Sequence, residues 1–305
     1  MKRDFTRLLD TTTEECTYLL ERAAFLKQVR KTRGEYKPLK DRTLAMIFEK
    51  ASTRTRISFE VGIQQLGGNA LFLSPSETQM GRGEPVRDTA RVLSRYADAI
   101  MIRTYSQQTV EELARWASIP VINGLSDLYH PCQILADLLT VKERKGNLTD
   151  MKIAYVGDGN NIANSWIEAS ILFGFPLAVA SPEGYGPFKE VVDAAEEKGT
   201  LTLTTDPFAA AKEADVINTD VWVSMGMEKE KEERKQAFGP FRLDDELMKV
   251  AKPDAIVMHC LPAHRDQEIT DAVFERFQDV IFTQAENRLY VQQALLEWLI
   301  TKTDE

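Results

Sequence analysis

The sequence contains few cysteines and histidines and lacks any long apolar run. Its three cysteines (Cys16, Cys132 and Cys260) are odd in number and form no C-x-x-C pair, so the sequence indicates neither a disulfide framework nor a zinc ribbon. No apolar run reaches the roughly 20 residues that a transmembrane helix needs, and the segment after Phe5 does not resemble a secretory signal. We therefore expect a cytoplasmic protein.

Basic residues are outnumbered, because 38 Lys and Arg stand against 47 Asp and Glu and give a net charge of −9. A surface of this sign excludes a broad nucleic-acid interface, so an anionic ligand would need a local basic pocket. The hydrophobic fraction of 43% and the charged fraction of 28% are typical of a soluble globular enzyme. A chain of 305 residues exceeds the usual size of one core and predicts two domains.

Strand and helix patterns alternate along the chain, which predicts an α/β protein with two doubly wound domains and parallel sheets. The first domain is expected to have strands at 43–48, 69–73, 99–102 and 120–122 and helices at 53–67, 85–96, 108–117 and 131–145. The second is expected to have strands at 152–156, 177–180, 201–204, 215–218, 255–258 and 279–282. The turn-rich segment 145–150 predicts domains at 1–146 and 147–287, with a C-terminal helix at 288–305 that packs back on the first.

The most informative segment is Glu49–Arg56, which lies between an apolar strand pattern and a helix pattern. Ser52 is expected to be the N-cap, with Thr53, Arg54 and Thr55 in the first helical turn. Unpaired backbone N–H groups, hydroxyls and a guanidinium together make a cradle for phosphate or a similar anion. The alternative is a capped helix with a solvated basic turn, but cations there oppose the helix dipole. We favour the anion site.

Two further clusters follow strand patterns in the first half, at the sheet edge where open α/β sheets bind ligands. Arg103 ends the strand 99–102, where it either reaches a cleft or lies at the surface. His130 precedes Pro131, a residue favoured at the first position of a helix, so the dipole keeps the imidazole neutral and able to donate a hydrogen bond. Gln133 either caps this helix or joins the site.

Three clusters in the second half have the same placement. The turn Gly157–Asn161 lacks the third glycine of a dinucleotide fingerprint, because Ile162 stands at that position, and its tandem asparagines suit a zwitterionic small molecule. Asp220–Gly226 either holds an amino-acid head group or forms an ordinary turn around a buried tryptophan. Cys260 by itself is more often a buried filler than a reactive thiol. The charged run 227–236 predicts a mobile loop or a solvated helix.

Taken together and in this order, these clusters resemble the aspartate/ornithine carbamoyltransferase family. The resemblance is carried by S-T-R-T-R at 52–56, by Arg103, by H-P-C-Q at 130–133 and by H-C-L-P at 259–262, which span most of the chain. The pattern D-x-W-x-S-M-G at 220–226 resembles the ornithine branch in particular. We see no proline-containing loop of the aspartate branch.

The resemblance implies two α/β domains with the active site in the cleft between them, and a trimer of identical chains with shared active sites. It implies transfer of the carbamoyl group from carbamoyl phosphate to the side-chain amine of L-ornithine, giving L-citrulline and phosphate, in arginine biosynthesis. No cofactor and no metal are implied, and no nucleic acid or membrane is expected as a partner.

The resemblance also implies the site residues. Carbamoyl phosphate would be bound by Ser52, Thr53, Arg54, Thr55, Gln79, Arg103, His130, Pro131, Cys132, Gln133, Cys260, Leu261 and Arg288. Gln79 would do so in the neighbouring subunit's site. Ornithine would be held by Asn161, Asp220, Ser224 and Met225. Either Asn160 or Asn161 points inward, and we favour Asn161.

The implied catalytic residues are Thr55, Arg103, His130 and Cys260. The first three would donate hydrogen bonds to the oxyanion that forms when the amine attacks the carbamoyl carbon. Cys260 would lie near that amine, which has a lysine-like pKa of about 10.4 in water and must first lose a proton.

Three other functions remain open at this stage. A carbamoyltransferase for putrescine or an acylated ornithine is disfavoured because a substrate without a free α-amino acid group has no use for Asp220. A nucleotide-linked oxidoreductase is disfavoured by Ile162 in place of the third glycine. A non-catalytic binding protein would be separated by an assay for citrulline.

Overall fold

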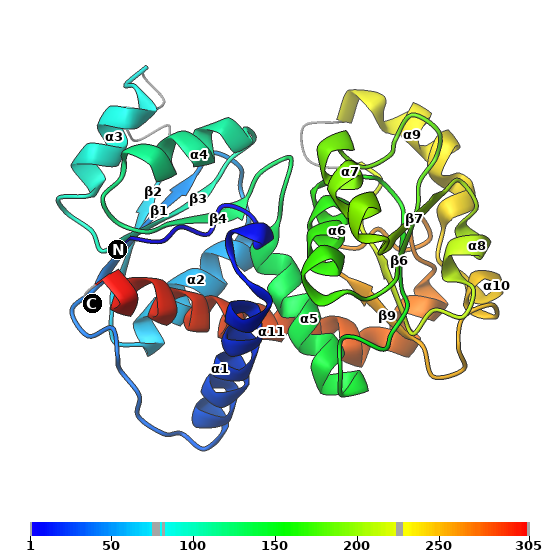
Figure 1. The fold of residues 1–305 in the computed structure, drawn as a ribbon, viewed down its shortest axis with the longest axis horizontal. Coiled ribbons are helices and arrows are strands. Elements are labelled where there is room, and N and C mark those ends of the chain that lie inside the picture. The colour runs from blue at the N-terminus through cyan, green and yellow to red at the C-terminus, as the bar shows by residue number, and fades with distance from the viewer. Residues whose placement is uncertain (1, 75–79, 81–82, 224–227, 304–305) are drawn as a thin grey trace. The chain divides into compact units, whose positions relative to one another are not determined.

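Figure 1 shows the computed structural model of the chain, which describes residues 2–74, 80, 83–223 and 228–303. The chain forms two compact units, one made of Met1–Leu139 with Asn287–Glu305 and the other of Thr140–Glu286. The sequence analysis placed the corresponding boundaries after residues 146 and 287. The chain passes between the units within two helices, α5 (Pro131–Lys145) and α11 (Asp271–Thr303). Over the described residues, none of the helices combines the length and apolar character that crossing a bilayer requires.

The first unit is built on a parallel sheet, as the sequence predicted, and its strands lie in the order β2-β1-β3-β4. Its strands are apolar runs flanked by turn residues, and β1, β3 and β4 are buried along almost their whole length. Helices cover both faces, with α3 and α4 on one face and α2 on the other (Figure 1). The elements are η1 (Leu8–Asp10), α1 (Thr13–Lys31), β1 (Thr43–Phe48), α2 (Thr53–Gln65), β2 (Asn69–Leu73), α3 (Val86–Leu93), β3 (Ala99–Arg103), α4 (Gln107–Trp116) and β4 (Val121–Leu125).

The second unit is built on a parallel sheet of order β7-β6-β5-β8-β9. Alternate residues of its strands, such as Ala154 and Val156, form one core with α8, α10 and the start of α11. The elements are β5 (Ile153–Val156), α6 (Asn161–Phe173), β6 (Leu177–Ala180), α7 (Lys189–Lys198), β7 (Leu201–Thr204), α8 (Pro207–Ala211), β8 (Val216–Thr219), η4 (Glu228–Glu230), α9 (Lys231–Phe238), η5 (Gly239–Phe241), α10 (Asp245–Met248) and β9 (Ile256–His259).

In each sheet, successive strands are added first on one side of the first strand and then on the other. The candidate site lies at this switch in strand order. In the first unit the reversal lies between β1 and β3, and in the second it lies between β5 and β8. Doubly wound sheets bind ligands just beyond the carboxyl ends of the strands at such a switch point. The turns that follow these four strands are therefore the expected ligand-binding segments.

The predicted strand at 279–282 is wrong, because these residues belong to the long helix α11. The helix also begins at Asp271, well before the predicted start at residue 288. The apolar run Val280-Ile281-Phe282 suggested a strand, but no glycine or proline interrupts the sequence from residue 271 to residue 303. A short apolar run does not distinguish a strand from a helix by periodicity alone. Here Ile281 packs into the core of the second unit while Phe282 is half exposed.

Within the first unit, α11 holds the N-terminal helix α1 through one ionic cluster. Glu297 accepts hydrogen bonds from Arg22 Nε at 2.8 Å and from Arg22 Nη2 at 2.7 Å. The Tyr36 hydroxyl also contacts this carboxylate, and burial together with Glu297 raises the pKa of Tyr36 to about 12. Glu297 is itself buried. The cluster therefore fixes α1 on the same helix that supplies Arg288 to the site described below.

We expect Glu297→Ala to lower the free energy of unfolding by about 2–3 kcal/mol, because it leaves the Arg22 charge and the Tyr36 hydroxyl without their common acceptor. Thermal unfolding of the purified variant checks this. The matched control is Glu35→Ala, since Glu35 pairs with Lys37 at 2.7 Å but keeps 77% of its side chain exposed. The control should leave the melting temperature unchanged. Equal melting temperatures for both variants would contradict a structural role for the cluster.

Candidate active site

The turn between β1 and α2 has the predicted N-cap geometry. Ser52 Oγ accepts a hydrogen bond from the Thr55 backbone N–H at 3.2 Å and donates to Thr55 Oγ1 at 3.1 Å. Thr55 is buried, whereas Thr53 and Arg54 are exposed in the first turn of the helix. The free N–H groups of this turn, the two exposed side chains and the helix dipole together suit a bound anion.

Arg103 lies at the end of β3, beside that turn. Its register partner in the sheet is Phe48, the last residue of β1, so the turn at Ser52 and Arg103 leave the sheet at neighbouring positions. The Arg103 carbonyl accepts from the Glu49 N–H at 2.9 Å, and the side chain is buried. A buried guanidinium at the switch point adds positive charge to the anion-binding turn.

The third cluster begins α5, which starts at Pro131 as predicted. His130 is buried directly before it, and burial, followed by Arg288, Arg103 and Lys50, lowers the pKa of His130 well below its usual value of 6.5. The imidazole is therefore neutral at physiological pH. A neutral imidazole can donate a hydrogen bond to a carbonyl oxygen without carrying a charge.

Arg288, on α11, joins these clusters. Its Nη2 donates to Thr55 Oγ1 at 3.0 Å, and its Nη1 contacts Gln133 Oε1 and lies 3.4 Å from His130 Nε2. Gln133 in turn donates from Nε2 to Asp137 Oδ1 at 2.7 Å. All of these groups belong to the first unit. The sequence-predicted residues from α2, α5 and α11 are therefore in contact with one another.

Cys132 contributes no thiol to this cluster. The side chain is fully buried, Sγ lies 3.4 Å from the Asn123 carbonyl, and burial raises the pKa of the thiol to about 12. The thiol therefore stays protonated at neutral pH. Any contact of Cys132 with a ligand at the start of α5 would come from its backbone N–H.

In the second unit, the turn after β5 meets the segment after β8. Asn160 is the N-cap of α6, where its Oδ1 accepts from the Ile162 N–H at 2.9 Å. Its Nδ2 donates to Asp220 Oδ2 at 3.0 Å. The asparagine in contact with Asp220 is thus Asn160, while Asn161, the residue we favoured for ornithine, is the first residue of the helix and is partly exposed.

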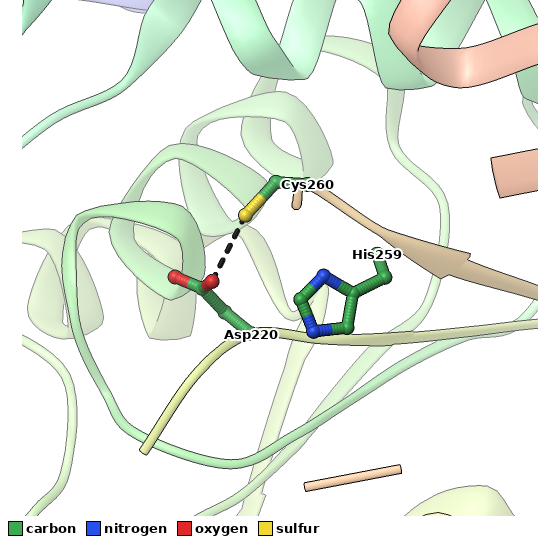
Figure 2. A group of neighbouring side chains, drawn as sticks. All are labelled: Asp220, His259 and Cys260. Atoms are coloured by element: carbon green, nitrogen blue, oxygen red, sulfur yellow. Dashed lines mark hydrogen bonds between the residues drawn. The ribbon is translucent and has the colours of Figure 1, made fainter. Parts of the chain in front are cut away.

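Asp220 also contacts Cys260, which follows β9, as Figure 2 shows. Cys260 Sγ lies 2.9 Å from Asp220 Oδ1, and the same oxygen accepts from the Val221 N–H at 2.8 Å. The Asp220 carboxylate is buried and receives donors on both oxygens. It is therefore held in one orientation, as a binding site for a cationic ligand group requires.

His259 lies beside this pair and supports it rather than joining it (Figure 2). Its Nδ1 accepts from the Leu261 N–H at 2.9 Å, and its Nε2 lies 3.1 Å from the buried Glu268 carboxylate. The first contact holds Leu261 in the left-handed region, at φ 58°, which is strained for a non-glycine residue. His259 therefore fixes the backbone that carries Cys260.

The side chains of Asp220, His259 and Cys260 offer ligand atoms that lie within 4.8 Å of one another, a spacing that a metal site could use. Both ring nitrogens of His259 are, however, engaged by Leu261 and Glu268. Two ligands then remain, fewer than the three or four protein ligands of typical zinc sites. The cluster fits a hydrogen-bonded support better than a metal centre.

Three predicted site residues lie outside the described residues, namely Gln79, Ser224 and Met225. Of the charged run 227–236, residues 228–230 form η4 and residues 231–236 belong to α9.

Sequence reasoning missed two buried cations near these turns. Lys50 is buried, donates to Asp127 Oδ1 at 3.0 Å and lies 5.0 Å from the centre of the Tyr105 ring. Its signal was its place in the turn Glu49–Arg56. Arg234 is buried on α9, where it contacts the Asp158 carboxylate. Nothing local distinguished Arg234 from the other charges of its run.

Comparison with known proteins covers both units. The family described as aspartate/ornithine carbamoyltransferase, carbamoyl-P binding domain, matches residues 3–143. The companion family, described as aspartate/ornithine carbamoyltransferase, Asp/Orn binding domain, matches residues 149–299. Together these matches account for nearly all of the described chain.

Individual relatives match over the same length. An ornithine carbamoyltransferase of Pelobacter propionicus is 58% identical over 302 residues, with 98% of this chain and 99% of that one covered. The structure of ornithine carbamoyltransferase from Pyrococcus furiosus matches with a TM-score of 0.94 at 50% identity, covering 98% of this chain and 97% of that one. An anabolic ornithine carbamoyltransferase from Campylobacter jejuni matches with a TM-score of 0.92 at 44% identity, covering 98% and 99%.

These matches span both units and contain the clusters at Ser52, Arg103, His130, Asp220 and Cys260. The chain belongs to the aspartate/ornithine carbamoyltransferase family.

Proposed function

We propose that the chain transfers the carbamoyl group of carbamoyl phosphate to the side-chain amine of L-ornithine, giving L-citrulline and phosphate. The observation that carries this proposal is the buried, oriented Asp220 carboxylate beside Cys260, in a chain whose full-length relatives are named ornithine carbamoyltransferase. A carboxylate in that position is a partner for the α-ammonium group of an amino acid. Putrescine keeps a second ammonium group but lacks the α-carboxylate of an amino acid. An acylated ornithine has no free ammonium group at that position.

Carbamoyl phosphate is assigned to the first unit. The phosphate would bind at the N-terminus of α2 with Ser52, Thr53 and Arg54, where backbone N–H groups and a guanidinium meet. The carbamoyl group would lie near Arg103, His130 and Arg288, with Pro131, Cys132 and Gln133 forming the start of α5 beneath it and Leu261 among its further contacts.

The chemistry follows from these assignments. Attack of the ornithine amine on the carbamoyl carbon gives a tetrahedral oxyanion, to which Thr55, Arg103 and neutral His130 donate hydrogen bonds. Fixed donors in a buried site stabilise such charge more strongly than water does. Breakdown of the intermediate releases phosphate to the helix N-terminus, and the phosphate can accept the proton that the amine loses.

Ornithine is assigned to the second unit, with Asn161, Ser224 and Met225 as further contacts of the amino-acid head group and Cys260 near the reacting amine. The reaction is placed in arginine biosynthesis and in the cytoplasm. A relative at 44% identity is described as anabolic, which supports the biosynthetic direction.

The decisive experiment is a citrulline assay with purified protein, carbamoyl phosphate and L-ornithine. Parallel reactions contain putrescine or N-acetylornithine in place of ornithine. Citrulline formation without added cofactor, and little product from the other amines, is the expected result. Product only from putrescine or the acylated amine would replace this proposal by the corresponding relative, and no product from any amine would favour a binding protein.

Removing the Arg54 guanidinium tests the phosphate assignment. Arg54→Ala should raise the KM for carbamoyl phosphate about 10–100-fold, since a charge-assisted hydrogen bond contributes about 1.5–3 kcal/mol. Steady-state kinetics with carbamoyl phosphate as the varied substrate measure this. Arg91→Ala is the control, because Arg91 is an exposed arginine of the same unit whose contacts, with Asp88 of its own helix and with the Trp116 ring, involve none of the proposed site residues. An unchanged KM in Arg54→Ala would show that phosphate binds elsewhere.

The pH dependence should report the ornithine amine rather than His130. Because burial and neighbouring cations keep the pKa of His130 well below 6.5, this imidazole gains no proton between about pH 6 and 9. The attacking amine must lose a proton, so kcat/KM for ornithine should rise through this range and level off only near the amine pKa. The measurement is kcat/KM at each pH, calculated once from the total ornithine concentration and once from the concentration of its neutral-amine form. A flat profile in total ornithine, with chemistry rate-limiting, would contradict the mechanism.

The assembly is proposed to be a homotrimer in which Gln79 reaches the neighbouring site. Support comes from β2, an edge strand of the first sheet whose side chains Leu71 and Phe72 stay 47% and 37% exposed. Ile57, on α2, is also 54% exposed. Exposed apolar side chains on a sheet edge are typical of an interface between chains.

Sedimentation equilibrium should give three times the 34.5 kDa of one chain. Leu71→Asp should shift the protein towards single chains, because it would bury a charge at the interface. The matched control is Leu203→Asp on β7, an exposed leucine at the edge of the second sheet, which should leave the assembly unchanged. Equal effects of the two substitutions, or none from Leu71→Asp, would move the interface elsewhere.

A further inference from the structure

Arg234 is buried on a helix that otherwise carries charges towards solvent. Only 4% of its surface is exposed, although α9 has the sequence Lys231-Glu-Glu-Arg-Lys-Gln-Ala-Phe238. The guanidinium contacts the Asp158 carboxylate through Nη2 and donates from Nε to the Trp222 carbonyl at 2.6 Å. It also lies 4.9 Å from the centre of the Tyr185 ring and 5.2 Å from that of Phe238. A planar group with several fixed donors is needed to make all of these contacts at once.

These contacts join the two segments that hold Asp220. Asp158 lies two residues before Asn160 in the turn after β5, and Trp222 lies two residues after Asp220 in the segment after β8. The two segments are linked directly by the hydrogen bond from Asn160 to Asp220 and a second time through Arg234. With one contact the two segments could still rotate about it, whereas the second contact also restricts that rotation.

The second link bears on the geometry at Asp220. The carboxylate meets Asn160 Nδ2 at 3.0 Å and Cys260 Sγ at 2.9 Å, and both contacts depend on the direction in which residues 220–222 leave β8. The Trp222 side chain is buried and stacks on Phe238 of α9, with ring centres 6.1 Å apart. Arg234 and Phe238 thus hold the same residue, by its carbonyl and by its ring.

We propose that Asp158 and Arg234 are positioning residues for the ornithine head group, and that they act through Trp222 and Asn160 to hold the Asp220 carboxylate in place. The inference rests on the proposed function and adds to it two residues that do not touch the substrate. A mobile carboxylate must be ordered when ornithine binds, and that ordering weakens binding. The pair therefore contributes to ornithine affinity while leaving carbamoyl phosphate affinity alone.

The charge of Asp158 gives the pair a pH dependence. Burial raises the pKa of Asp158 to about 7, while Arg234 opposes the shift and Asp220 and Glu230 add to it. Tyr155, from β5, also faces this cluster, and burial followed by Asp220 and Asp158 raises its pKa well above 10, so it stays neutral. Below about pH 7 the Asp158 carboxyl gains a proton and its link to Arg234 weakens; above that pH the ionic link is complete.

The test compares Arg234→Met, Asp158→Asn and the double variant with the wild-type protein, using the KM of each substrate, kcat and the melting temperature. Lys252→Met is the matched control, because Lys252 also pairs with a mostly buried aspartate of the second unit, Asp215, at 2.8 Å, but at the opposite end of the sheet. Where Arg234→Met does not fold, Arg234→Lys carries the test, since it keeps a cation but cannot make both contacts.

The expected result is a rise of about tenfold or more in the ornithine KM of each single variant, with the KM for carbamoyl phosphate and the control variant within about twofold of wild type. The ornithine KM of the double variant should not exceed that of the single variant with the higher KM, because both substitutions remove the same link. The ratio of ornithine KM between Asp158→Asn and wild type should shrink towards one as the pH falls from about 8.5 to 6, since the asparagine resembles the protonated acid.

Three outcomes would overturn the proposal: equal losses for both substrates, independent and additive effects of the two substitutions, or a KM ratio that does not change with pH. If Lys252→Met shows the same loss as the Arg234 and Asp158 variants, the loss reflects reduced stability of the second unit and not positioning of Asp220. A wild-type protein that forms no citrulline would reject the proposed function itself. Citrulline formation by wild type with an unchanged ornithine KM in the variants would reject only the positioning role.

Discussion

The contacts of Arg288 are the interaction on which the first unit's site depends. Three segments distant in the sequence meet there, because one guanidinium contacts Thr55 on α2 and both His130 and Gln133 at the start of α5. These three partners are neutral at physiological pH, so they orient the cation without cancelling its charge. Burial and, after it, the charge of Arg288 keep His130 neutral, and the same charge is directed to the place where an anionic substrate is needed.

Much of this arrangement could be predicted from the sequence, because its signals are local. An N-capping serine, a proline at the first position of a helix and an apolar run before each are properties of a few neighbouring residues. Since parallel strands end at a common edge, placing each motif after a strand was enough to bring Ser52 and Arg103 together. The order of the motifs then identified the family, which the comparisons confirmed.

What the sequence did not indicate depends on contacts between distant segments. The apolar run at 280–282 looked like a strand because its partner in the core is not encoded beside it. Arg234 looked like one charge among many, although tertiary packing buries it against Asp158 and two aromatic rings. Asn160 and Asn161 are equivalent by composition, and only the capping geometry of α6 directs Asn160 to Asp220. Such preferences are set by packing, which no local pattern records.

The burial of the cysteines has a practical consequence for chemical labelling. Cys16 and Cys132 are fully buried, and burial raises their thiol pKa values to about 11 and about 12, so both react slowly with alkylating reagents at neutral pH. Cys260 is only partly buried and lies against Asp220. The chain therefore carries a natural single-site reporter: a fluorescent maleimide or an isotope-coded alkylating agent should modify one position, and its rate of reaction should record whether the neighbouring carboxylate is occupied.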